Sequence, residues 1–224
     1  EFSSAVRAVN GQPDLELRSL QGTLDESLFG RMATHPQVAL ASPVLELSTY
    51  ATGPDRKRLP VRVVGVDALT VAAMAPALMP LPAPGADRLA LLAPATVFLN
   101  PAAMAALVPG GLAGASGPSL QLQSALALRA VTVAGTVNAP GAPLAVMDIG
   151  AAQDLFGATG RLSRIDLRLQ PGTDRAAFIA ALQLPAGVTA GEPGDAAERV
   201  SNLSRAYRVN LSVLALVALF TGAF

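Results

Sequence analysis

Short runs of alternating apolar and polar side chains predict most of the strands in this chain. In the first run, Leu15 and Leu17 alternate with Glu16 and Arg18, which is typical of a strand with one buried face. Further strands are predicted, by alternation or by apolar runs, over 38–52, 59–66, 89–99, 120–137, 144–149 and 164–169. The chain is therefore expected to be rich in β-structure.

The alternation within segment 120–137 leaves two arrangements open. The segment is either two strands of a sheet or one long bent strand. In both cases Leu120, Leu122, Leu126 and Leu128 are expected together on one face, with glutamines on the other.

Helix-capping residues predict short helices between these strands. Thr23 and Glu26 have the spacing of a capping box, which predicts a helix that runs to about Thr34 and ends before Pro36. Asn100-Pro101 predicts another helix start, because Asn caps the first turn and Pro suits the first helical position. Further short helices are predicted after Asp67, over 151–156 and over 174–182.

The order of these elements predicts an α+β fold with two lobes. Segments 11–78 and 143–194 each read as β-α-β pieces and together would form one discontinuous, ferredoxin-like lobe. Segment 79–142 would then be inserted as a second, mainly β lobe. A Pro-rich stretch near its start is typical of a linker.

The two ends of the chain are predicted to lead toward a membrane. Residues 195–224 read as one helix that starts amphipathic, and Leu211–Phe224 carries no charge. That last run would span roughly 21 Å, less than the roughly 30 Å of a bilayer core, so we expect part of a longer membrane helix. For Leu211–Phe224, the alternative is a buried core helix. At the other end, residues 1–10 read as the end of a preceding helix.

Composition narrows the class of protein. Of the 224 residues, 51% are hydrophobic, which is enough for a sizeable core, and sixteen basic side chains balance sixteen acidic ones. A zero net charge gives no general attraction to nucleic acid, so no nucleic-acid partner is expected. The chain has no Cys, which excludes disulfides and thiol catalysis. Lys57 is its only Lys, a bias toward Arg that is typical of a GC-rich bacterial genome.

Candidate catalytic and binding motifs are weak. His35 is the only imidazole, and its place beside Pro36 predicts a helix-end capping role rather than a general base. Gly114–Gly117 matches neither a nucleophile elbow nor a phosphate loop. Asp25-Glu26 is expected to cap a helix. The sequence thus predicts no catalytic residues, no cofactor-binding residues and no metal ligands, and a chain that is not an enzyme.

Two further features have a surface or a core interpretation. Arg56-Lys57-Arg58 reads as a solvated hairpin turn, with contact to an acidic partner or to lipid headgroups as the alternative. Met74, Met79 and Met104 are expected to fill the core, with an adaptable apolar surface as the alternative.

Several structural motifs follow one another in an order that resembles a known family. They are Gly11–Arg18, His35–Val38 with Ala41–Val44, Val131–Val137, Ala151–Gly157, Ile165–Gly172 and the final apolar helix. In this order the chain resembles the periplasmic core domain of MacB-like, FtsX-family ABC transporter permeases. The likeness covers nearly the whole chain.

The resemblance implies a non-enzymatic part of a transporter. The domain would face the periplasm from the bacterial inner membrane, with a porter-type lobe flanked by membrane-helix stalks. A cytoplasmic ABC-type ATPase subunit would drive motion through the membrane to act on a periplasmic protein or lipoprotein partner. Lipoprotein extraction, export and cell-envelope remodelling are the roles it implies, and no cofactor is implied.

A second interpretation remains open from the sequence. The chain would be a membrane-tethered extracytoplasmic sensor or ligand-binding domain of a signalling protein. That interpretation requires a ligand pocket between the two lobes, which the sequence does not reveal.

Overall fold

A computed structural model describes residues 12–20, 22–112 and 117–193. Its described residues up to Ala190 belong to one compact unit, and a second unit begins at Gly191. The strands of the described residues are β1 Leu15–Ser19, β2 Leu24–Asp25, β3 Val38–Thr52, β4 Arg58–Val66, β5 Leu81–Pro82, β6 Thr96–Leu99, β7 Ser119–Ser124, β8 Ala127–Thr136, β9 Leu144–Asp148, β10 Arg161–Leu162, β11 Arg164–Leu169 and β12 Val188–Gly191. The helices are α2 Ser27–Ala33, α3 Val71–Met74, η1 Pro76–Leu78, η2 Ala90–Leu92, α4 Pro101–Leu107, α5 Ile149–Phe156 and α6 Arg175–Ala181.

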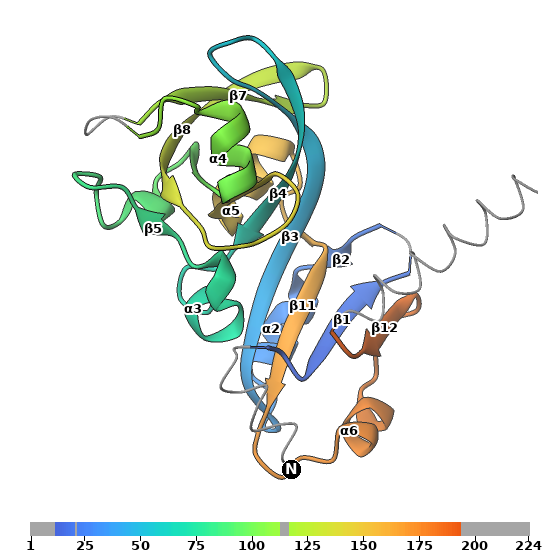
Figure 1. Ribbon diagram of the computed structural model, residues 1–224. Helices are drawn as coiled ribbons and strands as arrows, with labels where there is room; N and C mark the ends of the chain where they lie inside the picture. Colours follow the sequence, from blue (N-terminus) through green and yellow to red (C-terminus); the bar gives the residue numbers. More distant parts are fainter. Residues whose placement is uncertain (1–11, 21, 113–116, 194–224) are drawn as a thin grey trace, which may run out of the picture. The chain divides into compact units, whose positions relative to one another are not determined.

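Strand β3 connects the two parts of the large sheet (Figure 1). Within the described residues, this sheet has the order β12-β1-β11-β3-β4-β9-β6-β8-β5, and β7 pairs with both β3 and β8. The first part of β3 pairs with β11 and the second part with β4, and Val44 pairs with residues of both neighbours. Because one strand serves both sides, the two parts of the sheet share a continuous backbone.

Apolar side chains fill separate clusters on the two sides of this shared strand. One cluster joins β1, β11 and the start of β3 to helices α2 and α6, with Leu17 and Phe178 at its centre. Another joins the end of β3 to β6, β8 and helices α4 and α5, with Val97 and Val133 fully buried. A third lies around Phe98.

Side-chain caps begin three of the helices. The Asn100 carboxamide accepts a hydrogen bond from the Ala103 amide at 3.0 Å, which confirms the predicted start of α4. Asp148 and Asp174 cap α5 and α6 in the same way, and each satisfies backbone donors that the first helical turn leaves free. Asn100 is fully buried and also donates to the carbonyls of Ala139 and Ala142, so it fastens a loop as well as a helix.

The predicted capping box at Thr23 and Glu26 is wrong. Leu24 and Asp25 form β2, which pairs with β10, and α2 begins only at Ser27 without a side-chain cap on Glu26. The pairing of β2 with a strand far along the chain takes up the residues that a capping box would place in the first turn. A local motif was overridden by this long-range pairing.

Two predicted strand segments also differ from the structure. Residues 89–99 hold the short 3-10 helix η2 and then the four-residue strand β6, because only Thr96–Leu99 pairs with β8 and β9. Segment 120–137 is two strands joined at Ala125 and Leu126. Leu120 and Leu122 are buried, whereas Leu126 and Leu128 are exposed, so the four leucines do not share one face as predicted.

A two-residue turn explains the exposure of these leucines. Its register places Leu128 opposite Gln123 rather than opposite Leu122, so Leu128 lies on the polar face of the hairpin. The four leucines occupy even-numbered positions, so their spacing in the sequence does not indicate this change of face.

The predicted terminal helices over 1–10 and 195–224 lie outside the described residues. The lobe boundaries at 11–78, 79–142 and 143–194 stay a prediction. In the part of the chain that is described, no helix combines the length and the apolar character needed to cross a membrane.

Candidate functional site

A row of charged side chains crosses one face of the sheet where its two parts meet. The register places Glu16 of β1 beside Asp166 of β11, and Arg18 beside Arg164. Asp166 in turn lies opposite Ser42 of β3, and Arg164 lies opposite Val44. Residues directly opposite in a sheet point to the same face, so these charges form one continuous patch.

Arg164 is the centre of this patch and is largely buried. Its Nε donates to Asp166 Oδ1 at 2.8 Å, and its Nη1 donates to the Glu46 carboxylate on β3. Beside it, Arg18 Nε donates to Glu16 Oε2 at 2.8 Å. We call Glu46, Arg164 and Asp166 the junction cluster, because it ties β11 to the shared strand β3.

Burial and charge act in opposite directions on the acids of the junction cluster. Burial raises the pKa of Asp166, because removing its carboxylate from water outweighs the attraction of Arg164. Burial would also raise the pKa of Glu46, but the charge and hydrogen bond of Arg164 outweigh it and hold that pKa below its ordinary value. Although burial opposes its charge, the two carboxylates together raise the pKa of Arg164, which stays protonated.

Ser163 adds a second tie at the same point. The Glu46 amide donates to Ser163 Oγ at 2.8 Å, and Ser163 Oγ donates back to the Glu46 carbonyl at 3.1 Å. This reciprocal pair and the junction cluster hold β3 on β11 beyond the residues of their backbone pairing. The arrangement contains no free nucleophile; it is a rigid polar connection.

The junction cluster was not predicted from the sequence. The alternation of Ile165 and Leu167 with Asp166 and Arg168 is typical of a strand with one polar face, but the structure leaves only 3% of Asp166 exposed. The available signal was the complementary charge of Glu46 and Arg164, which lie 118 positions apart. Their proximity depends on the order of strands, which alternation within one strand does not specify.

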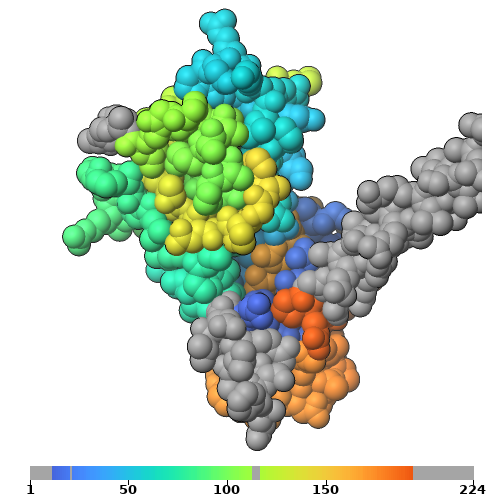
Figure 2. Space-filling model, in the orientation of Figure 1, coloured from blue at the N-terminus to red at the C-terminus, as the bar shows by residue number. Residues whose placement is uncertain are grey.

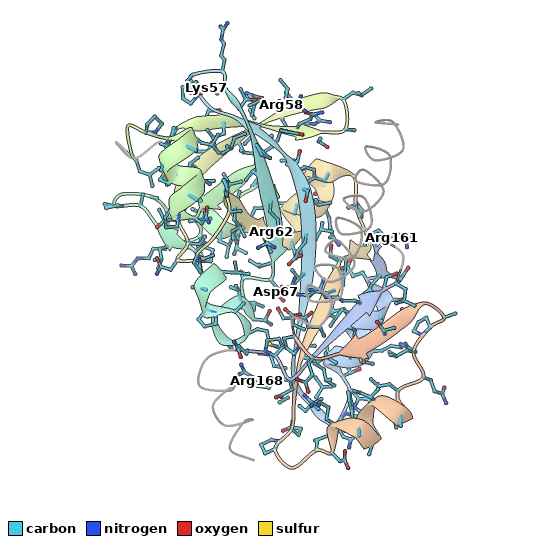
Figure 3. All side chains as sticks on the ribbon, turned by 45° about the vertical axis from the view of Figure 1, so that its right-hand side comes forward. Lys57, Arg58, Arg62, Asp67, Arg161 and Arg168 are labelled. Atoms are coloured by element: carbon cyan, nitrogen blue, oxygen red, sulfur yellow. The ribbon has the colours of Figure 1, made fainter. Side chains whose placement is uncertain are left out.

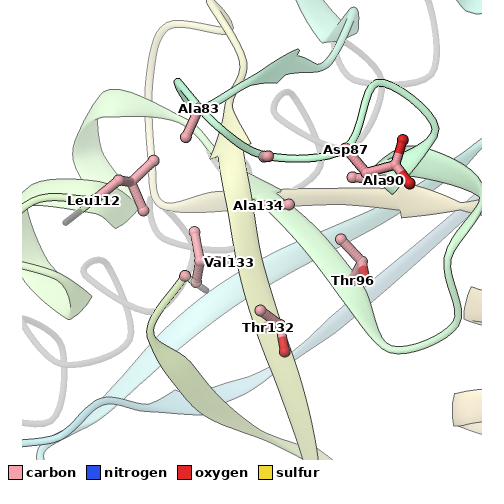
Figure 4. A pocket seen from close by; sticks show the side chains of 10 residues that line it. Ala83, Asp87, Ala90, Thr96, Leu112, Thr132, Val133 and Ala134 are labelled. Atoms are coloured by element: carbon pink, nitrogen blue, oxygen red, sulfur yellow. The ribbon is translucent and has the colours of Figure 1, made fainter. Parts of the chain in front are cut away.

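A pocket of about 350 Å³ lies beside β8 (Figure 4). Small side chains form most of its wall, and Asp87, Thr96 and Thr132 are the polar side chains that Figure 4 labels there. The Asp87 carboxylate accepts a hydrogen bond from the Leu89 amide at 2.8 Å. The volume is in the range of small-molecule sites, but the pocket has few convergent polar groups to orient a ligand.

His35 does not cap a helix carbonyl with its ring. Its Nδ1 accepts a hydrogen bond from the Gln37 amide at 3.2 Å, and its ring packs edge-on against Phe178. Thr34 instead donates its hydroxyl to the Gly30 carbonyl at 3.0 Å. The imidazole is therefore part of the packing between α2 and α6.

The paired acids Asp25 and Glu26 have different partners. Asp25 Oδ1 accepts from the Ser27 amide at 2.9 Å, and hydrogen bonds with Ser27 lower the pKa of Asp25. Glu26 Oε2 accepts from Gln153 Nε2 at 3.1 Å. Within the described residues, no cluster of three or more His, Cys, Asp or Glu has the proximity needed for a metal ion.

The methionines divide between core and surface. Met74 is buried and Met104 packs against the core, as predicted, whereas 38% of Met79 is exposed.

Within Gly114–Gly117, residues 114–116 lie outside the described residues. Gly117 lies against the Val133 carbonyl, where a Cβ would collide with the backbone.

The basic turn Arg56-Lys57-Arg58 lies at the end of the β3–β4 hairpin (Figure 3). The Arg58 guanidinium stacks 3.8 Å above the Tyr50 ring. Its Nη2 also donates to Gln123 of β7, which links this hairpin to the β7–β8 hairpin. Arg58 is therefore held in place, whereas Lys57 extends into solvent.

The fold is similar to those of solved periplasmic and extracellular domains of transporters. No family model matches the sequence. The periplasmic region of MacB from Actinobacillus actinomycetemcomitans is similar, with a TM-score of 0.61, 10% identity, 86% of this chain and 94% of that chain covered. The extracellular domain of the noncanonical ABC-type transporter YknZ from Gram-positive bacteria has a TM-score of 0.60 at 11% identity, with 80% of this chain and 99% of that chain covered.

A domain of a proposed permease protein from Porphyromonas gingivalis has a TM-score of 0.53 at 15% identity, with 81% of this chain and 88% of that chain covered. An uncharacterised ABC transporter permease of Mycobacterium tuberculosis is 38% identical over 81 residues. These residues are 36% of this chain and only 9% of that permease, so the chain spans a small part of its relative. The MacB-like fold expected from the sequence is confirmed.

Proposed function

We infer from this fold and from the stretch shared with a permease that the chain is the extracytoplasmic domain of an ABC transporter permease. The observation that carries the inference is the agreement of two independent likenesses. The fold matches solved domains of the transporters MacB and YknZ, and the sequence matches a permease at 38% identity over 81 residues. Neither likeness depends on the other.

We propose that the domain transmits motion rather than performing chemistry. Strand β3 is shared by both parts of the sheet, and the junction cluster and Ser163 fasten it to β11. A hydrogen-bonded strand with buried side chains on its flanks resists bending, so a displacement applied to β1 and β11 would move β4 with them. The mechanical role is supported by this continuity.

The proposed context is a bacterial inner membrane with the domain on its periplasmic side. A cytoplasmic ABC-type ATPase subunit would supply the motion, and residues 195–224 would form the stalk that carries it. Lipoprotein extraction, export and cell-envelope remodelling are the candidate outcomes of that motion. These assignments rest on the resemblance and on the sequence of the stalk.

The proposal is tested in the parent permease reconstituted with its ATPase subunit. We would insert Gly-Pro after Ser204 and measure ATP hydrolysis and transport together. Proline and glycine disrupt a helix by about 3 kcal/mol or more, so transport is expected to stop while basal hydrolysis continues. An insertion of two alanines at the same place is the matched control for added length.

Two results would contradict the proposal. The mechanical role is wrong if the Gly-Pro variant transports as well as the two-alanine variant. The permease assignment itself is wrong if the parent protein neither binds an ABC-type ATPase nor contains further membrane spans.

A further inference from the structure

Strand β8 has a free edge along its first residues. It pairs with β7 over Ala127–Thr132, whereas on its other side the pairing with β6 begins only at Thr132. Within the described residues, no strand pairs with β8 on this second side before Thr132. The backbone of β8 is therefore open to an added strand at this edge.

Leu128 and Ala130 direct their backbone groups to the free edge. The Thr132 amide donates to the Ala95 carbonyl at 2.8 Å, which identifies the side of β8 that faces β6. Backbone groups of alternate residues in a strand point to the same side, so those of Leu128 and Ala130 point there as well. Ala95 has φ of +53°, a left-handed conformation that residues other than Gly rarely adopt, and β6 begins only after it.

A groove of about 490 Å³ lies along the free edge. Ala95, Ala151 and Leu155 line it and pack, partly buried, against the apolar cluster beneath. A strand added to β8 would cover this apolar surface with one face while its backbone pairs with Leu128 and Ala130. We call this site the edge groove and define it by Ala95, Arg129, Ala130, Ala151, Asp154 and Leu155.

The edge groove contains one cation and one anion that do not pair with each other. Arg129 and Asp154 both line it, and neither forms an ion pair with another described residue. Ser124, beside the β7–β8 turn, donates its hydroxyl to the Leu155 carbonyl at 2.8 Å. This contact holds the end of α5 near the turn, so Asp154 lies toward Ala127 and Arg129 lies further along β8.

We propose that the edge groove binds an extended polypeptide segment as an added antiparallel strand. The segment carries an acidic side chain opposite Arg129 and, two residues later on the same face, a basic side chain directed to Asp154. Its alternate residues lie opposite Leu128 and Ala130 and are apolar, because Leu128 is 61% exposed on the outer face. Antiparallel pairing is preferred because it is more stable per residue than parallel pairing.

Charge excludes two other interpretations of this surface. If two copies of β8 paired through both Leu128 and Ala130, Arg129 would lie opposite Arg129, and like charges in that position are destabilising. The basic turn Arg56-Lys57-Arg58 does not contribute, because the antiparallel pairing of β7 with β3 directs the β7–β8 turn away from it. Figure 2 shows the β3–β4 turn protruding at the top of the molecule.

The absence of Trp from the chain permits a direct binding test. The probe is the capped peptide Thr-Val-Glu-Trp-Lys, whose Trp emission reports the peptide alone. In the proposed register its Glu lies opposite Arg129, its Trp opposite Leu128 and its Lys opposite Ala127. Titration with the full chain is expected to raise the fluorescence anisotropy of the Trp until the groove is saturated.

Two altered peptides separate strand pairing from unspecific adhesion. The peptide Thr-Val-Lys-Trp-Glu has the same composition with its charges exchanged, and it is expected to bind roughly 10-fold more weakly because both charge pairs become repulsive. Methylation of the Val and Trp amides removes the donors that face β8 and should weaken binding by at least about 10-fold. Methylation of the Glu amide, which faces away, is the matched control and should change little.

Two variants of the chain locate the bound peptide. Arg129→Gln is expected to weaken binding about 3-fold, and to have no effect on a peptide with Gln in place of Glu. Ala130→Pro removes the N–H at the free edge, not one that pairs with β7, and should weaken binding by at least about 10-fold. Arg56→Gln on the β3–β4 turn is the matched control and should change nothing.

The proposal is overturned if the probe does not bind, or if the peptide with exchanged charges binds equally well. It is also overturned if methylation acts equally at all three amides, since the peptide is then not paired as a strand. The peptide methylation results do not depend on how the variants of the chain fold. None of these measurements involves an ATPase or a membrane, so the transporter assignment would be unaffected by them.

Discussion

At the scale of single residues, Arg164 shows how context decides the role of a charge. It is largely buried, and it holds Asp166 on its own strand and Glu46 on the neighbouring strand. A buried cation without partners would be strongly unfavourable, so each of its carboxylates stabilises the fold by satisfying it. The three side chains therefore act as one unit.

Replacing Glu46 tests that unit by its pH dependence. At pH 7, Glu46→Gln is expected to lower the free energy of unfolding by about 1.5–3 kcal/mol, because Arg164 loses a charged acceptor. The pKa of Glu46 is lowered in the folded protein, so its contribution is present above the ordinary value of about 4.3 and is lost as the pH falls through the folded value. Urea denaturation of both proteins between pH 3 and 7 measures the difference.

A matched control separates this pair from an exposed one. Asp55 and Lys57 form an ion pair at 3.8 Å with an exposed lysine, so Asp55→Asn is expected to change the stability by less than about 1 kcal/mol. A Glu46→Gln effect that is the same at pH 3 and pH 7 would show that the ion pair is not its cause.

At the scale of elements, Gly65 decides how closely helix α5 approaches strand β4. A Cβ at this position would lie 2.9 Å from Ala152 Cβ and 3.2 Å from Ile149 Cα. Real side chains do not approach so closely, so the helix is seated directly on the glycine. This contact packs α5 directly against β4. It also brings α5 onto the apolar cluster that includes residues of β4 and β8.

Filling this contact is expected to destabilise the protein. Gly65→Ala should lower the free energy of unfolding by about 1–3 kcal/mol, because α5 must move away from β4. Adding Ala152→Gly should return part of the loss, although Gly inside a helix costs about 1 kcal/mol. Chemical denaturation of the single and double variants gives the coupling between the two positions.

Gly30 provides the control for a glycine without such a neighbour. It lies inside α2, and a Cβ there would meet nothing within 4 Å. Gly30→Ala is expected to raise the stability by up to about 1 kcal/mol through helix propensity. Equal effects of alanine at positions 30 and 65 would mean that α5 is not seated on Gly65.

At the scale of the whole molecule, the shared strand β3 predicts that the described unit unfolds as one. Its two sides have separate apolar clusters, one around Leu17 and one that includes Leu99. Each cluster uses part of β3, so the loss of one removes pairing from the other. The two sides are therefore expected to share their stability.

Paired core variants test this cooperativity. Leu17→Ala and Leu99→Ala should each lower the free energy of unfolding by about 2–5 kcal/mol. Both are expected to shift a single calorimetric transition to lower temperature, with equal calorimetric and van't Hoff enthalpies. Two transitions, of which each variant shifts only one, would show that β3 does not couple the sides.

Much of the local structure was predictable because its causes are local. The run 38–52 is β3, and the Asn100-Pro101 pair begins α4, since alternation and capping act over a few neighbouring residues. The capping box at Thr23 failed where a distant strand took its residues. Leu128 was expected on the same face as Leu120 and Leu122, because the sequence does not display a change of face at a two-residue turn.

The sequence by itself determined the positions of most strands, the cap of helix α4 and the MacB-like order of motifs. Only the tertiary structure decided which charges are buried together and which leucines are left outside. Strand alternation separates two faces but does not say what will cover either of them. That depends on pairings between residues more than a hundred positions apart, such as Glu46 with Arg164, which form only when the sheet assembles.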